Sequence, residues 1–177
     1  MAAAVAPITG SLATASLTRN ERVLIAQYLL RAGLRSPIVR CETGLPPSTV
    51  RDLARDVNGG KRASSGPLPS SAYLIENRVA LLEASLWAAI YLRIGGEKIC
   101  ETGDVFQILH AHRLYMRLRE QFPERQAEAF NATKVWVLAR DLRSDMAWIH
   151  RCGNCRVNYI VVEDQKIPAG CPICDIR

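Results

Sequence analysis

Two closely spaced pairs of cysteines near the end of the sequence constrain the fold more than any other feature. Cys152 and Cys155 form the first pair, and Cys171 and Cys174 form the second pair after 15 intervening residues. Each Cys-x-x-Cys turn directs two sulfur atoms at one point, and the doubled spacing is typical of a structural zinc site. Four thiolates complete a tetrahedral shell and leave no position for water or substrate. We therefore expect one structural Zn²⁺ at these residues, and no catalytic metal.

Other interpretations of the cysteines are weaker. A thioredoxin-like redox pair needs a low-pKa cysteine at a helix N-terminus in a βαβ setting, and neither pair has one. Six cysteines in a chain of 177 residues favour a metal in a reducing cytoplasm over a secreted disulfide framework. His150 is expected to be a neighbour of the site and not a ligand. Cys41 and Cys100 have no partner at ligand spacing, and we expect both to be half-buried.

The residues before the cysteines have mainly helical patterns, and the pattern changes to short strands at residue 146. We predict a mainly α protein with an N-terminal three-helix unit, a central helical core and a small zinc-ribbon-like unit with four cysteines and short β-strands. The predicted divisions are a flexible tail over 1–17, a helix-turn-helix unit over 18–60, a linker over 61–71, a helical core and partner-binding region over 72–145, and a zinc-binding unit over 146–177.

Residues that start and stop helices set the expected boundaries. Thr18 and Glu21 have the spacing of a capping box, Ser36 is a plausible N-cap, and Pro46-Pro47 opens a third helix. Longer helices are predicted over about 72–94, 103–121 and 124–143. The segments "MAWIHR" and "VNYIVV" predict strands beside the cysteines, with one strand out and back between the two pairs.

The positive charge of the chain is concentrated in its first third. Residues 1–62 contain nine Lys and Arg against four Asp and Glu, whereas residues 71–145 contain ten of each. The segment "SPIVRCETGLPPSTVRDLARDV" has the pattern of a helix-turn-helix, with Val50 and Leu53 facing the core. The same pattern also fits an ordinary three-helix packing unit. The charge favours DNA, and the predicted contacts are Ser48, Thr49, Arg51, Asp52, Arg55, Lys61 and Arg62.

Several classes of protein are not supported by the sequence. The start of the chain lacks the basic and apolar regions of a signal peptide, and we find no apolar run of about 18–20 residues. The middle helices show no Gly-rich phosphate loop and no convincing catalytic set. Their basic residues are balanced by acidic ones, so a salt-bridged surface is expected there. We therefore expect a cytoplasmic protein that is not an enzyme, with no membrane and no small-molecule substrate.

Considered together, the segments of this chain resemble the FlhC family, the zinc-bearing subunit of the flagellar master activator. The resemblance runs from about Arg22 to Cys174. The segments that carry it are "CETGLPPSTVRDLARDV", "GPLPSSAYLI", "HRLYMRLREQFPE", "TKVWVLARDLRSDMAWIHRCGNC" and "CPIC".

The resemblance implies a DNA-binding transcriptional activator subunit that acts with a FlhD-type partner as a hetero-oligomer. Such an assembly binds double-stranded promoter DNA and recruits RNA polymerase. The zinc ligands of the family correspond to Cys152, Cys155, Cys171 and Cys174. Related activators on conjugative plasmids and integrative elements switch on transfer genes, so flagellum biogenesis and conjugation are both possible outputs. The alternative is a zinc-stabilised interaction adaptor that does not bind DNA directly.

Overall fold

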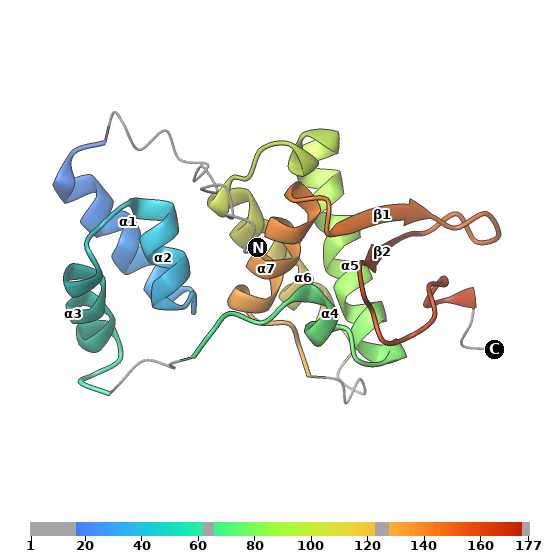
Figure 1. The fold of residues 1–177 in the computed structure, drawn as a ribbon, viewed down its shortest axis with the longest axis horizontal. Helices are drawn as coiled ribbons and strands as arrows, with labels where there is room; N and C mark the ends of the chain where they lie inside the picture. The colour runs from blue at the N-terminus through green and yellow to red at the C-terminus, as the bar shows by residue number, and fades with distance from the viewer. Residues whose placement is uncertain (1–16, 62–65, 123–127, 175–177) are drawn as a thin grey trace, which may run out of the picture. The chain divides into compact units, whose positions relative to one another are not determined.

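The computed structural model describes residues 17–61, 66–122 and 128–174, and the chain divides into two compact units (Figure 1). The first unit comprises residues 1–65 and the second comprises residues 66–177. The described residues form helices and one two-stranded sheet, so the predicted mainly α fold class is confirmed. Each unit has its own buried apolar residues.

The described part of the first unit, residues 17–61, forms three helices that all contact one another. They are α1 (Arg19–Arg31), α2 (Ser36–Thr43) and α3 (Pro47–Val57). Apolar residues at helical spacing form the core between them because burial of this surface stabilises each helix. The core residues are Ala26, Leu29, Leu34, Ile38, Val39, Leu45, Val50 and Ala54.

The ends of these helices follow the local sequence with one exception. The capping box is confirmed, since Thr18 Oγ1 accepts the Glu21 N–H at 3.3 Å and the Thr18 N–H donates to Glu21 Oε2 at 2.7 Å. The prediction of Ser36 as an N-cap is wrong, because Arg35 is the N-cap and Ser36 is the first helical residue. Proline is tolerated throughout the first turn, where N–H groups have no partner in the helix, so Pro37 did not fix the start to one residue.

The second unit contains most of the chain's helices and all of its described strands. Helix α5 packs against α6, α7, η2 and strand β2 and is the centre of this unit. Its largest fully buried side chains include Trp87 and Tyr91, whose rings stack with centroids 4.9 Å apart. The helices are α4 (Ser71–Leu74), α5 (Arg78–Gly95), the 3-10 helix η2 (Gly96–Cys100), α6 (Val105–Glu120) and α7 (Ala132–Arg143).

Two predicted helices of this unit are shorter than expected. The single helix over 72–94 is wrong, because residues 75–77 interrupt it and Asn77 Oδ1 accepts the Ala80 N–H at 2.9 Å to start α5. The helix over 124–143 is also wrong at its start, since Asn131 caps α7 by accepting the Lys134 N–H at 2.9 Å. An asparagine side chain accepts a hydrogen bond from a backbone N–H of the first helical turn and so fixes where the helix begins. A pattern of apolar residues extends to the N-terminal side of this point and does not mark it. Pro123 lies outside the described residues.

The two strands form an antiparallel hairpin that packs on α5. Strands β1 (Ala147–Arg151) and β2 (Asn158–Val162) pair with Ala147 opposite Val162. The N–H of buried Ile160 donates to Ser85 Oγ of α5 at 3.2 Å, so the hairpin belongs to the same unit as the helices. The strands lie where "MAWIHR" and "VNYIVV" predict them, with β1 before the first cysteine pair and β2 between the pairs. The chain returns from β2 to the second pair without a further strand in the described residues.

The stretch Arg78–Cys100 is long and apolar enough to cross a membrane by length and composition alone. The sequence analysis missed it because Arg78, Glu83 and Arg93 interrupt the apolar run. One face of this stretch is buried against α6 and β2, and that face includes the polar side chains of Glu83 and Ser85. These contacts are those of a core helix, and a core helix passes the same test.

Candidate metal centre

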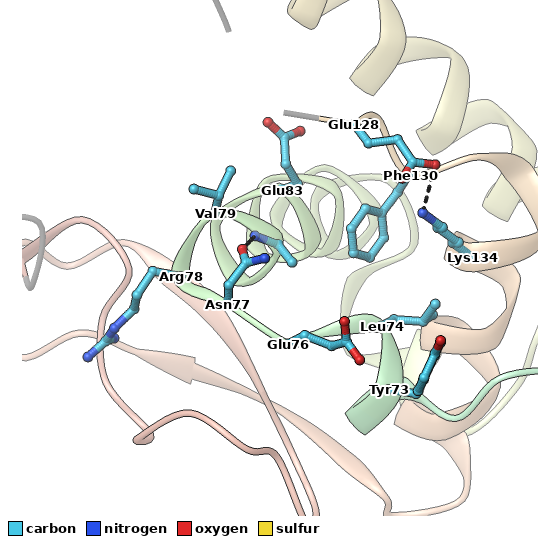
Figure 2. Close-up of a pocket in the computed structure, with 11 residues that line it drawn as sticks. Tyr73, Leu74, Glu76, Asn77, Arg78, Val79, Glu83, Glu128, Phe130 and Lys134 are labelled. Atoms are coloured by element: carbon cyan, nitrogen blue, oxygen red, sulfur yellow. Dashed lines mark hydrogen bonds and ion pairs between the residues drawn. The ribbon is translucent and has the colours of Figure 1, made fainter. Parts of the chain in front are cut away.

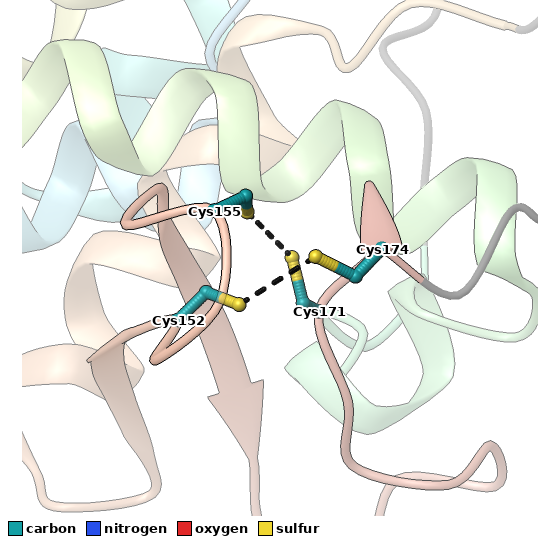
Figure 3. A group of neighbouring side chains, drawn as sticks. All are labelled: Cys152, Cys155, Cys171 and Cys174. Carbon is teal, nitrogen blue, oxygen red and sulfur yellow. Dashed lines mark hydrogen bonds between the residues drawn. The ribbon is translucent and has the colours of Figure 1, made fainter.

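The sulfur atoms of four cysteines converge at the turn end of the hairpin, where residues 152–157 join β1 to β2. Figure 3 shows the side chains of Cys152 and Cys155 facing those of Cys171 and Cys174, and all four sulfur atoms lie within 4.8 Å of one another. Two cross-pair distances are 3.8 Å (Cys152 to Cys174) and 3.5 Å (Cys155 to Cys171). A tetrahedral ion with Zn–S bonds of about 2.3 Å separates its sulfur atoms by about 3.8 Å. The cluster therefore has the dimensions of a four-thiolate metal site.

Backbone hydrogen bonds shape the first cysteine turn. The Cys152 N–H donates to the Val157 carbonyl at 2.9 Å, and the Arg156 N–H donates to the Cys152 carbonyl at 3.0 Å. Arg156 has a φ of 61°, which turns the chain back into β2. The backbone N–H groups of Cys155 and then Asn154 donate to the Cys152 sulfur and lower the pKa of that thiol to about 6. The turn thus favours the thiolate, which is the form that binds a metal.

The pKa of the Cys174 thiol is shifted in the opposite direction. Hydrogen bonding with the neighbouring thiols, Cys155 above all, raises the pKa of Cys174 to about 12. The side-chain amide of Asn154 donates to Cys174 Sγ at 3.5 Å and acts in the opposite direction. A divalent cation between the four sulfur atoms stabilises every thiolate at once and removes this penalty. The donor set therefore fits a metal ion.

All four predicted ligands are brought together, and no other His, Cys, Asp or Glu of the described residues joins their cluster. Cys171 is buried, whereas Cys155 is exposed. His150 lies outside the cluster, as expected, with its ring 6.0 Å from that of Tyr159. The expectation for Cys41 and Cys100 is wrong, because both are exposed. Sequence reasoning missed Asn154, although an amide inside a Cys-x-x-Cys turn is well placed to donate to a sulfur atom.

The residues predicted to contact DNA lie in or just after α3. Ser48, Arg51, Asp52, Arg55 and Lys61 are exposed, and Thr49 is half-buried. Arg62 lies outside the described residues. The Arg55 and Asp52 side chains form an ion pair at 3.7 Å but are 60% and 68% exposed, so solvent screens the pair and it constrains Arg55 little.

The inner face of α3 is made of Val50 and Ala54, which are both buried, and of Leu53, which is half-buried. Leu53 therefore packs less completely against the core than expected. Because these residues recur at spacings of three and four, the charged residues between them lie on the opposite, outer face.

Two basic residues of the middle helices form ion pairs within the fold. Arg119 Nε lies 3.0 Å from Glu83 Oε2, and the Tyr115 hydroxyl donates to the same carboxylate oxygen. Glu83 is 1% exposed, so this group is almost fully removed from water. Lys134 Nζ lies 3.0 Å from Glu128 Oε1. The expected salt bridges are therefore present, although no local pattern in the sequence indicates that Glu83 is buried.

A cavity of about 590 Å³ lies beside these residues (Figure 2). Its lining carries three carboxylates and two cations, and Glu83 and Lys134 are already bound to partners in the fold. The cavity offers no cluster of groups with a common chemistry. The residues that line it are Tyr73, Leu74, Glu76, Asn77, Arg78, Val79, Ala80, Glu83, Glu128, Phe130 and Lys134.

The fold and the cluster define a mainly helical protein with a C-terminal group of four cysteines whose geometry fits a metal ion. The sequence model of the family described as "Flagellar transcriptional activator (FlhC)" matches residues 13–177. The "Flagellar transcriptional regulator FlhC" of Sodalis glossinidius (strain morsitans) is 30% identical over 149 residues, which cover 81% of this chain and 71% of that protein. The chain belongs to the FlhC family. This is a family of transcriptional regulators, which are not a class of enzyme, and its description supports an activator role.

Proposed function

We propose that this chain is the DNA-binding subunit of a cytoplasmic transcriptional activator. It acts with a FlhD-type partner as a hetero-oligomer, binds double-stranded promoter DNA and recruits RNA polymerase. The observation that carries the proposal is the outer face of α3, which exposes Arg51 and Arg55 in the most basic third of the chain.

The chemistry of α3 suits a recognition helix in a helix-turn-helix. Gly44 has a φ of 66° and makes the turn between α2 and α3. Ser48 is exposed in the first turn of α3, where free N–H groups and the helix dipole favour a phosphate. One turn further along, Arg51 and Arg55 are spaced to reach phosphates or guanine edges in a major groove.

The proposed metal is one structural Zn²⁺ bound by Cys152, Cys155, Cys171 and Cys174. Thiolate ligands in tetrahedral geometry favour zinc over the harder divalent ions. Four protein ligands fill the shell, so the ion supplies cross-links between the hairpin and the segment after it and no Lewis-acid chemistry. The target genes are those of flagellum biogenesis or of conjugative transfer.

The test measures promoter binding by the full-length protein with its partner subunit. Replacing both Arg51 and Arg55 by Gln should weaken binding at least tenfold, because each interaction with a base or a phosphate contributes about 1–3 kcal/mol. The slope of log K against log salt should also fall by about 0.9 for each phosphate that the variant no longer neutralises.

Arg31→Gln is the matched control, since Arg31 is an exposed arginine on α1. Its affinity for the promoter should stay close to that of the unsubstituted protein. Equal affinity in the double variant would contradict the assignment of α3. An assembled complex with no salt-sensitive affinity for any DNA would favour the adaptor function instead.

A further inference from the structure

The two faces of the β1–β2 hairpin differ in what they present. One face carries Ala147, Ile160 and Val162, which are all buried where the hairpin packs on the helices of its unit. The register pairs Trp148 with Val161 and His150 with Tyr159 on the other face. Trp148 is 42% exposed, His150 is exposed and Tyr159 is half-buried. Three rings therefore occupy one accessible face of the hairpin.

The charge of the hairpin has a single sign. Residues 146–162 contain Arg151 and Arg156 and no Asp or Glu. Both arginines are exposed, and neither forms an ion pair with any residue that the structure describes. The acidic residues Glu163 and Asp164 follow β2 at the opposite end of the hairpin. Arg151 pairs with Asn158 in the last register position of β1, and Arg156 lies in the turn. Both cations are therefore at the turn end of the hairpin, next to the ring pair of His150 and Tyr159.

We propose that this ring-bearing face binds single-stranded DNA. Trp148, His150 and Tyr159 stack on unpaired bases, and Arg151 and Arg156 contact the phosphates. Successive side chains on one face of a strand lie about 6.8 Å apart, so Trp148 and His150 can each receive a separate base. The Tyr159 ring lies across the hairpin from His150, with centroids 6.0 Å apart, and widens the platform there. Bases stack on protein rings only where they are unpaired, and such platforms combine rings with a basic surface.

The inference rests on the proposed function, because an activator that recruits RNA polymerase works beside DNA that becomes unpaired at the promoter. A protein partner is the competing occupant, since Trp, Tyr and Arg are enriched in protein interfaces. Two features favour single-stranded DNA over a protein partner. Residues 146–162 contain no acidic residue, which favours a polyanion, and the rings on one face favour a ligand with flat bases.

The test uses the full-length, metal-loaded protein assembled with its partner subunit. Trp87 and Trp136 are buried, so a change in tryptophan emission on addition of oligo(dT) reports mainly on Trp148. We expect oligo(dT) to quench this emission, and raising the salt concentration to reverse the quenching.

Variants are compared by the anisotropy of labelled oligo(dT). Trp148→Ala should weaken binding about 5- to 100-fold, because one stacked base contributes about 1–3 kcal/mol. Trp148→Phe, which retains a ring, should restore most of the affinity. Arg156→Asn should reduce the salt slope by about 0.7, and asparagine tolerates the left-handed backbone at this position. Tyr73→Ala is the matched control, since Tyr73 is an exposed ring on α4.

Three outcomes would overturn the inference. They are an unquenched emission, equal affinity of Trp148→Ala and Tyr73→Ala, and protection of Trp148 from iodide by the partner subunit alone. The last outcome would assign the face to the protein interface. In the proposed function, affinity for duplex promoter DNA depends on Arg51 and Arg55. A protein that binds duplex promoter DNA but not oligo(dT) would therefore contradict this inference and leave the proposed function intact.

Discussion

Two ion pairs, one in each unit of this protein, place charged side chains in opposite environments. On α3 of the first unit, Arg55 and Asp52 form a loose ion pair in solvent, and Arg51 is exposed beside them. In the second unit, Glu83 is buried between the Tyr115 hydroxyl and the Arg119 guanidinium. Exposed pairs contribute little to stability, whereas breaking a buried pair leaves an uncompensated charge in a low-dielectric interior.

This difference separates residues that are free to bind a partner from residues that hold the fold. Residues 71–145 contain ten basic residues, and the described structure places two of them, Arg119 and Lys134, in ion pairs. The first unit has fewer basic residues but leaves those of α3 accessible. The accessibility of Arg51 and Arg55 supports the proposed DNA contact.

The largest expected effect is loss of the metal. Cys171→Ser removes a buried thiolate and should release the ion, which destabilises the hairpin by several kcal/mol because binding free energy is folding free energy at such sites. Metal analysis with hydrogen exchange by mass spectrometry should show lower protection in β1 and β2 and unchanged protection in α1–α3. The control is Cys41→Ser, an exposed cysteine in the first unit. Full metal content in Cys171→Ser would refute the predicted ligand set.

The second expected effect tests the buried pair. Glu83→Gln should lower the free energy of unfolding by about 3 kcal/mol, because the Arg119 side chain is only 12% exposed and keeps its charge without the carboxylate. Glu128→Gln is the matched control, since Glu128 pairs with Lys134 but is exposed, and it should cost less than about 1 kcal/mol. Urea denaturation measures the free energy of unfolding of both variants. Equal decreases would show that the buried and the exposed ion pair do not differ in their contribution to stability.

A third expectation concerns alkaline pH. Burial raises the pKa of Tyr91 to about 12 and also raises the pKa of Tyr115, both in the second unit. A raised pKa means that the folded state retains the proton more strongly than the unfolded state. The resulting contribution to the free energy of unfolding is complete below the unfolded pKa of about 10 and is lost as the pH rises through 12. Tyr91 alone accounts for about 2–3 kcal/mol of that loss.

Hydrogen exchange between pH 9 and pH 11 should therefore show the second unit weakening before the first. Tyr91→Phe serves as the control, because it removes the ionisable hydroxyl and should flatten the dependence on pH. An equal loss of protection in both units would contradict a role for tyrosine ionisation in the second unit. An unchanged dependence of protection on pH in Tyr91→Phe would also contradict it.

The smallest expected effect lies in the first unit. Asp52→Asn removes an exposed partner of Arg55 and should change the free energy of unfolding by less than about 0.5 kcal/mol. Removing a negative charge from the outer face of α3 should still strengthen promoter binding a few-fold at low salt. Thermal denaturation and a binding titration measure the two effects. A large decrease in stability would show that the exposed pair supports the fold after all.

Much of the secondary structure follows from the sequence because its signals are local. The capping box at Thr18 and Glu21, the turn at Gly44 and the prolines that open α3 all act within a few residues. The start of α7 was predicted too early, because the pattern of apolar residues extends to the N-terminal side of Asn131. Only the capping hydrogen bond of Asn131 shows where the helix begins. The four cysteines come together as predicted, because the spacing within each Cys-x-x-Cys pair is itself a local property.

The sequence by itself determined which cysteines meet, that the chain is mainly helical, and where its positive charge is concentrated. Only the tertiary structure decided that Glu83 is buried beside Arg119, that the hairpin packs on α5, and that Trp148, His150 and Tyr159 share an accessible face. The physical reason is distance along the chain. Short-range spacing fixes turns and ligand pairs, whereas burial depends on residues that lie dozens of positions apart and meet only after folding.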